Sequence, residues 1–98
     1  MKCSALVSFF CTFTFKNQEK MILIEETFDF QSEQEEAWEN NEELMDRIED
    51  YSEKLLEYFL NQVGKQEGIL CGGYVINTKK LLTVQVCGEV RSVIRNDN

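Results

Sequence analysis

The sequence predicts an α+β fold with the order β-β-α-β-β: a four-stranded, mainly antiparallel sheet with one long acidic amphipathic helix packed on one face. Three observations predict it. Apolar and polar residues alternate in two N-terminal runs and again over residues 81–95, which is the period of half-buried strands. Between these regions, apolar residues recur every three or four positions, as in a helix with one buried side. The 98 residues fit one domain, 1–98.

The first strand is predicted over residues 3–15. Its odd positions are apolar and its even positions carry all four Ser and Thr residues, so one face is expected to be buried. Lys2 followed by an apolar run is also the pattern with which a secretory signal peptide begins, and this alternative stays open. No small-x-small cleavage site precedes a polar mature start, which favours a retained strand. The run is too short and too polar to span a bilayer, so no membrane association is expected.

The second strand is predicted over residues 20–30. One face of this strand carries the apolar residues Ile22, Ile24, Phe28 and Phe30. A connecting loop with an even number of residues places odd positions of the first strand opposite even positions of the second, so that the two apolar faces coincide. A loop of two or four residues centred on 17–20 is therefore expected.

Large apolar residues also occupy the opposite face of this hairpin, at Leu6, Phe10, Met21 and Leu23. Four such side chains exceed what isolated surface hydrophobes explain. They predict either a covering second layer or a contact patch, used for a homodimer or for a specific partner.

A helix is predicted over residues 33–63. Ser32 and Glu35 have the spacing of a capping box, and Gly64 can adopt the left-handed conformation that ends a helix. Asn40 and Glu43 form a second possible capping box, so a break near 40–41 is plausible.

One side of this helix is acidic. From Glu25 to Glu57 there are 14 Asp and Glu residues against only Arg47 and Lys54. Carboxylates repeat at each helical turn, and neighbours at this spacing repel each other. The residues predicted to form a partner-binding face are Glu35, Glu36, Glu39, Glu42, Glu43, Asp46, Glu49, Asp50, Glu53 and Glu57.

Two further strands are predicted over residues 69–77 and 81–95. A three-residue loop between them would pair Tyr74 with Val84, and the same register would place Cys71 opposite Cys87, although whether these thiols bond is left open. The Gly pair at 72–73 is typical of a bulge or of a close approach by another element.

No catalytic residue, metal or cofactor is predicted, and the chain is not expected to be an enzyme. Histidine is absent, which removes the commonest general base, and the cysteines lack C-x-x-C spacing. Glu26, on an otherwise apolar strand face, is the single candidate general acid or base. We expect it to lie at a sheet edge or to pair with a Lys or Arg instead.

The acidic helix predicts a binding protein whose partner is basic, such as a nuclease or another nucleic-acid-binding effector. Direct nucleic-acid binding is not expected, because the carboxylates would repel phosphates. In size and charge alone, the chain resembles the small acidic inhibitors that phages use against host nucleases and CRISPR effectors, and antitoxins that neutralise basic toxins. That resemblance implies a cytoplasmic protein, in the host cytoplasm if phage-derived.

The alternative hypothesis is a small homo-oligomeric structural or adaptor domain. Here the acidic face only provides solubility, as acidic faces commonly do, and the apolar patch of the first hairpin joins two copies. Salt dependence separates the two hypotheses, because salt weakens electrostatic capture and spares apolar association.

Overall fold

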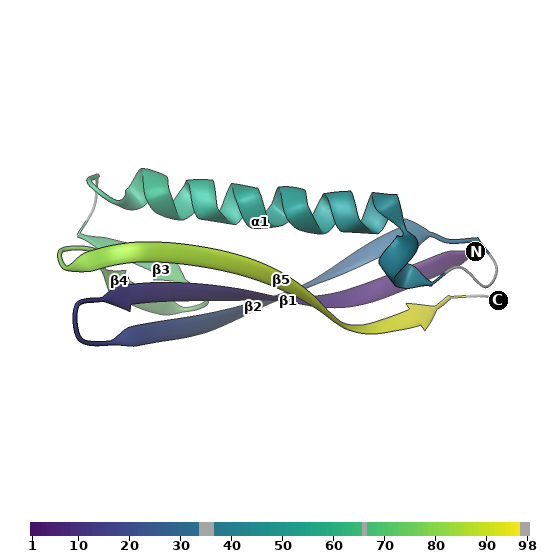
Figure 1. The fold of residues 1–98 in the computed structure, drawn as a ribbon, viewed down its shortest axis with the longest axis horizontal. Helices are drawn as coiled ribbons and strands as arrows, with labels where there is room; N and C mark the ends of the chain where they lie inside the picture. Colours follow the sequence, from purple (N-terminus) through teal and green to yellow (C-terminus); the bar gives the residue numbers. More distant parts are fainter. Residues whose placement is uncertain (34–36, 66, 97–98) are drawn as a thin grey trace.

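The computed structural model describes residues 1–33, 37–65 and 67–96. Five strands, one short 3-10 helix and one α-helix follow one another along the chain (Figure 1). Their bounds are β1 Lys2–Phe15, β2 Glu19–Gln31, η1 Trp38–Asn40, α1 Glu42–Gln62, β3 Gly68–Cys71, β4 Tyr74–Asn77 and β5 Leu81–Arg95. The α+β class, with one α-helix and antiparallel sheets, is confirmed.

The main sheet has three antiparallel strands in the order β2-β1-β5, with β1 in the centre. Phe9 pairs with Ile24 and Cys11 pairs with Ile22, so odd positions of β1 lie opposite even positions of β2. The register expected from the apolar pattern is therefore confirmed. It forms because only this pairing places both apolar faces on the same side of the sheet.

The predicted single four-stranded sheet is wrong, because five strands form two separate sheets. The expected strand 69–77 is a small hairpin, β3–β4, turned by Gly72 and Gly73. Both glycines have positive φ, +55° and +83°, which a two-residue hairpin turn of this kind requires. The two adjacent glycines therefore form a tight turn and not a bulge. The close approach by another element, the other alternative, is observed at Gly72, where a Cβ would lie 2.8 Å from Ile22 Cγ2.

The expected pairing of the last two strands does not form either. Val84 lies opposite Phe13 and Cys87 opposite Phe10, both on β1, while Tyr74 pairs with Cys71 inside the small hairpin. The four-residue β4 is too short to form backbone hydrogen bonds along the whole of β5, which has 15 residues. The 14-residue β1 has a second edge of matching length, and β5 takes it.

The α-helix starts at Glu42 and not at residue 33. The break considered near 40–41 is observed, because the short helix η1 ends at Asn40 and α1 follows as a separate helix. Its N-cap is Asn41, whose Oδ1 accepts the Leu44 N–H at 2.9 Å, so the cap lies one residue beyond the Asn40 box. The Asn41 amide also donates to the Gln31 carbonyl at 2.8 Å, which ties the helix start to the end of β2. The Ser32–Glu35 box falls partly outside the described residues.

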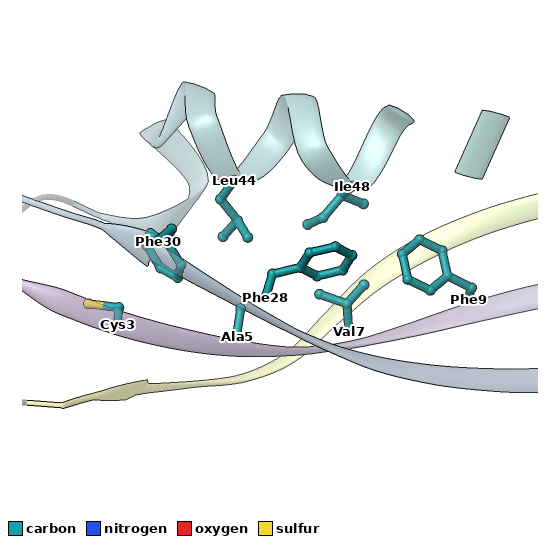
Figure 2. Close-up of a cluster of buried hydrophobic side chains, with 8 residues drawn as sticks. All are labelled: Cys3, Ala5, Val7, Phe9, Phe28, Phe30, Leu44 and Ile48. Atoms are coloured by element: carbon teal, nitrogen blue, oxygen red, sulfur yellow. The ribbon is translucent and has the colours of Figure 1, made fainter. Parts of the chain in front are cut away.

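The helix lies across one face of the main sheet, and the buried side chains between them form the core (Figure 2). Leu44 points from α1 toward Ala5 of β1, beside Phe30. Ile48 points toward the Phe28 ring and Val7. The Phe9 ring lies 4.6 Å from the ring of Tyr51, measured between centroids. These contacts fix which side of the helix faces the sheet, and so which side faces away.

A second cluster fills the other half of the same face, under the C-terminal part of α1 and the β3–β4 hairpin. The Phe13 and Phe59 rings meet edge-to-face with centroids 5.3 Å apart. Ile69 and Ile76 seat the small hairpin on this cluster, since both are buried. The hairpin is thereby held beside the outer edge of β2.

Candidate functional site

The acidic face of α1 consists of seven carboxylates that are all exposed: Glu42, Glu43, Asp46, Glu49, Asp50, Glu53 and Glu57. At 3.6 residues per turn they occupy about a third of the helix circumference and extend about 22 Å along the axis. The buried residues Leu44, Ile48 and Phe59 lie on the opposite side. Glu39, in η1, is also exposed. Glu35 and Glu36 lie outside the described residues.

The acidic face receives little neutralisation from the helix itself. Lys54 Nζ lies 2.9 Å from Asp50 Oδ2, and this hydrogen bond and charge pair raise the pKa of Lys54. Arg47 turns toward the sheet, where its guanidinium lies 5.2 Å from the Phe28 ring centroid and donates to the Asp29 carbonyl. Among the seven carboxylates of the acidic face, only Asp50 has an ion-pair partner.

The structure brings together three of the four residues predicted to form an apolar patch. Phe10 lies directly opposite Leu23, and Met21 is two residues along the same strand, on the sheet face away from α1. Leu23 is 43% and Met21 62% exposed. We call Phe10, Met21 and Leu23 the outer patch.

Leu6 does not join the outer patch. Between it and Phe10 lies Ser8, which faces Glu25 on β2 and Glu89 on β5. The Ser8 hydroxyl is buried and has no hydrogen-bond partner among the described residues. The two glutamates are exposed, so a row of charge interrupts the apolar surface.

Glu26, the single catalytic candidate, accepts a hydrogen bond from the Tyr51 hydroxyl at 3.0 Å. It lies on the edge strand β2, as expected, but its partner is a tyrosine of α1 instead of a Lys or Arg. Burial first, and then this bond to Glu26, raise the pKa of Tyr51. The pair links the helix to the sheet.

Within residues 1–33, 37–65 and 67–96, no three side chains of the metal-binding types gather around a common point. No helix in that portion combines the length and apolar character needed to cross a bilayer.

All four cysteines are free thiols. Cys71 is buried against Cys11 on the helix side of the main sheet. Cys87, the partner expected for it, lies opposite Phe10 and is exposed on the other face. Burial, with a smaller effect of the neighbouring Cys71, raises the pKa of the Cys11 thiol to about 12. Burial also raises the pKa of Cys71.

We expect a thiol reagent at neutral pH to label Cys87 rapidly in the native protein and to spare the three buried thiols. The thiolate is the reactive form, and a raised pKa leaves almost none of it at Cys11. Mass spectrometry should find one rapid adduct in the native protein and four after unfolding in urea. Rapid labelling of more than one thiol in the native state would contradict the packing.

Sequence reasoning missed a basic end of the molecule. The β1–β2 turn, the C-terminal end of α1 and the β4–β5 turn meet at one end of the elongated fold (Figure 1). The exposed lysines in or next to these segments are Lys16, Lys20, Lys65, Lys79 and Lys80. These lysines are distant in the sequence, so only the topology brings them together. The acidic residues of the same segments are Glu19 and Glu67.

A groove near the same end, between β2 and β4, was also not foreseen. It has a volume of about 580 Å³ and is lined by Lys20, Met21, Ile22, Leu23, Tyr74, Val75 and Ile76. The sequence signal was present in the exposed apolar residues of both strands, but their proximity depends on where the small hairpin packs.

The chain matches no protein-family model, no curated protein sequence and no solved structure.

Proposed function

We propose that the protein binds a basic surface of another protein through the acidic face of α1. The observation that carries this proposal is the shortage of local counter-charge. Seven exposed carboxylates follow one side of the helix, and only Asp50 is ion-paired. A row of like charges costs a few tenths of a kcal/mol for each neighbouring pair, and a basic partner would relieve that cost.

The partner surface is one that otherwise contacts nucleic-acid phosphates. Carboxylates at i, i+3 and i+4 positions lie about 5–6 Å apart, so the helix offers a regular line of negative charge. A surface that neutralises successive phosphates has cations at comparable intervals. The protein would then act as an inhibitor that occupies the nucleic-acid site of a nuclease or a similar effector.

The test is capture of partners from a cell lysate on immobilised protein at about 0.1 M salt, with elution at about 1 M, where the Debye length falls from about 10 to about 3 Å. We expect a nucleic-acid-binding protein in the eluate, displaced also by duplex DNA or RNA. The affinity of this partner should fall about 30-fold or more in the variant that combines Glu42→Lys, Asp46→Lys, Glu49→Lys and Glu53→Lys. The fall corresponds to about 2 kcal/mol, at roughly 0.5 kcal/mol for each exposed ion pair lost.

The matched control reverses four acids that lie outside the helix: Glu19, Glu25, Glu67 and Glu89. This control variant changes the net charge by the same amount as the helix variant but leaves the acidic face intact. If the position of the charges matters, the control should retain most of the affinity. Equal loss in both variants would reduce the effect to overall charge. Full affinity in the helix variant would refute the proposal.

A second candidate function is self-association as a structural or adaptor domain, and the outer patch favours it. Phe10, Leu23 and Met21 lie on the sheet face away from α1, where Leu23 and Met21 are exposed and the Arg91 guanidinium lies 5.8 Å from the Phe10 ring centroid. In this case sedimentation should show a dimer that persists at 1 M salt. The variant Leu23→Lys should make it monomeric, whereas Leu60→Lys, at a helix residue of similar exposure (54%), should leave the dimer intact.

A further inference from the structure

The groove between β2 and β4 has two walls that are both unpaired strand edges. β2 pairs with β1 on one side only, and β4 pairs with β3 on one side only. In a strand paired on one side, every second residue directs its backbone N–H and C=O outward. The backbone of both walls can therefore accept another extended chain.

Most side chains of the groove are apolar, and four of these are accessible. Met21 and Leu23 on β2 are joined by Tyr74 and Val75 on β4, which are 65% and 71% exposed. Ile22 and Ile76 are buried beside them, so the groove borders the core. Exposed apolar residues gathered along strand edges are a hazard unless something pairs with them.

Gly72 holds the two walls together at one end. A Cβ at this position would lie 2.8 Å from Ile22 Cγ2 and 3.6 Å from the Leu23 carbonyl oxygen. The turn of the small hairpin therefore touches β2, while β4 continues from there toward the basic end (Figure 1). Leu23 of the groove therefore lies next to the turn at Gly72, and Lys20 and the lysines of the β4–β5 turn lie toward the other end.

We propose that this groove binds an extended peptide segment of a partner protein, which adds as a strand to the free edge of β2. Only an extended backbone can pair with outward-facing N–H and C=O groups along a strand, as in other cases of strand addition. A volume of about 580 Å³ is within the range of specific ligand sites. The four residues of β2 that line it extend about 13 Å.

The chemistry of the segment follows from the lining. Residues at alternate positions should be apolar, because they contact Leu23 and Val75. Lys20 is the charged residue of the lining, and Lys79 and Lys80 lie in the turn that follows β4. The segment should therefore carry one or two carboxylates at the end that reaches these lysines. This site is independent of the acidic face, and neither proposal needs the other.

The probe is a phage-displayed library of random heptapeptides, selected on the full-length protein. We expect enrichment of alternating apolar sequences with Asp or Glu at one end. The best peptide, labelled with a fluorophore, should bind at least tenfold more weakly to the variant Val75→Glu. Hydrogen exchange should show new protection of β2 amides near Leu23 when the peptide is bound.

The matched control is Leu70→Glu. Leu70 is the direct cross-strand partner of Val75, is 62% exposed, and does not line the groove. It should leave peptide affinity unchanged. Replacing central peptide residues by proline should abolish binding, since proline cannot donate to a strand ladder. Lys20→Glu should weaken acid-ended peptides and spare their neutral analogues.

Three outcomes would overturn the proposal. The first is a selection that yields no sequence whose binding depends on Val75. The second is equal binding of proline-containing peptides, which would mean an apolar contact without strand pairing. The third is a Val75→Glu variant that dissociates a dimer without affecting any peptide, which would assign the groove to a second copy of this chain. The helix variant with four reversed acids separates the two proposals, because it should retain peptide binding even if its basic partner is lost.

Discussion

Replacing Phe9 by alanine should lower the free energy of unfolding by about 3–5 kcal/mol, the usual cost of deleting a buried aromatic ring. Phe9 is fully buried at the centre of the helix–sheet interface, with ring contacts to Phe28 at 6.0 Å and to Tyr51 at 4.6 Å between centroids. A domain of this size is typically stable by about 5–15 kcal/mol, so the loss is a large share of the total. Urea denaturation followed by circular dichroism measures it.

The control is the neighbouring residue. Phe10 has the same side chain on the same strand but points to the uncovered sheet face, where it is only half-buried. Phe10→Ala should cost about 1 kcal/mol, in proportion to the smaller apolar area that it buries. Similar losses for both variants would mean that the outer face is covered as completely as the inner one.

Replacing Gly88 by valine should destabilise the fold at the upper end of the about 1–3 kcal/mol that overpacking costs. A Cβ at this position of β5 would lie 2.8 Å from Ile48 Cγ2 and 2.9 Å from Phe9 Cε1. Both neighbours are buried, so neither can move without disturbing the core. The midpoint of thermal unfolding should fall by several degrees.

Gly68→Val is the matched control for this effect. Its Cβ would also meet a methyl group at 2.8 Å, Cγ1 of Val75, but that side chain is 71% exposed and can rotate away. We expect less than about 1 kcal/mol at Gly68. If Gly68→Val were as damaging as Gly88→Val, the close approach of Ile48 and Phe9 would not be the cause.

The alternating pattern was enough to predict the strands of the main sheet, because side-chain period and burial are directly linked in a strand. It predicted β5 over 81–95, as observed, and the register of β1 with β2. It did not predict which strand β5 joins. That choice depends on the length of β4. The sequence indicated a bulge or a close approach at Gly72 and Gly73, and the tight turn that shortens β4 was not foreseen.

The helix was predicted too long at its N-terminal end. Ser32, Asn40 and Asn41 are all good caps, and pattern alone does not choose among them. The structure selects Asn41 because its amide also reaches the Gln31 carbonyl, a contact between elements that local spacing cannot show. The predicted carboxylates from Glu42 onward are exposed on one side, whereas the binding role assigned to them stays a prediction.

The groove was out of reach of sequence reasoning for a similar reason. Its two walls are separated along the chain by the whole of α1, and each wall alone looks like an ordinary strand with exposed apolar residues. Only the seating of Ile69 and Ile76 on the second cluster places β4 beside β2.

The central position of β1 has a consequence for how the chain folds. The hairpin of β1 with β2 is local in sequence and can form early. The other neighbour of β1, β5, comes from the far part of the chain. The Asn96 amide, for example, donates to the Ser4 hydroxyl at 2.7 Å across 92 residues of sequence. Closing so long a loop costs entropy before any contact is made, and such non-local pairing slows folding. Until β5 docks, one edge of β1 and the floor of the core stay open to water. During synthesis, the nascent chain therefore remains vulnerable to aggregation until β5 has been made.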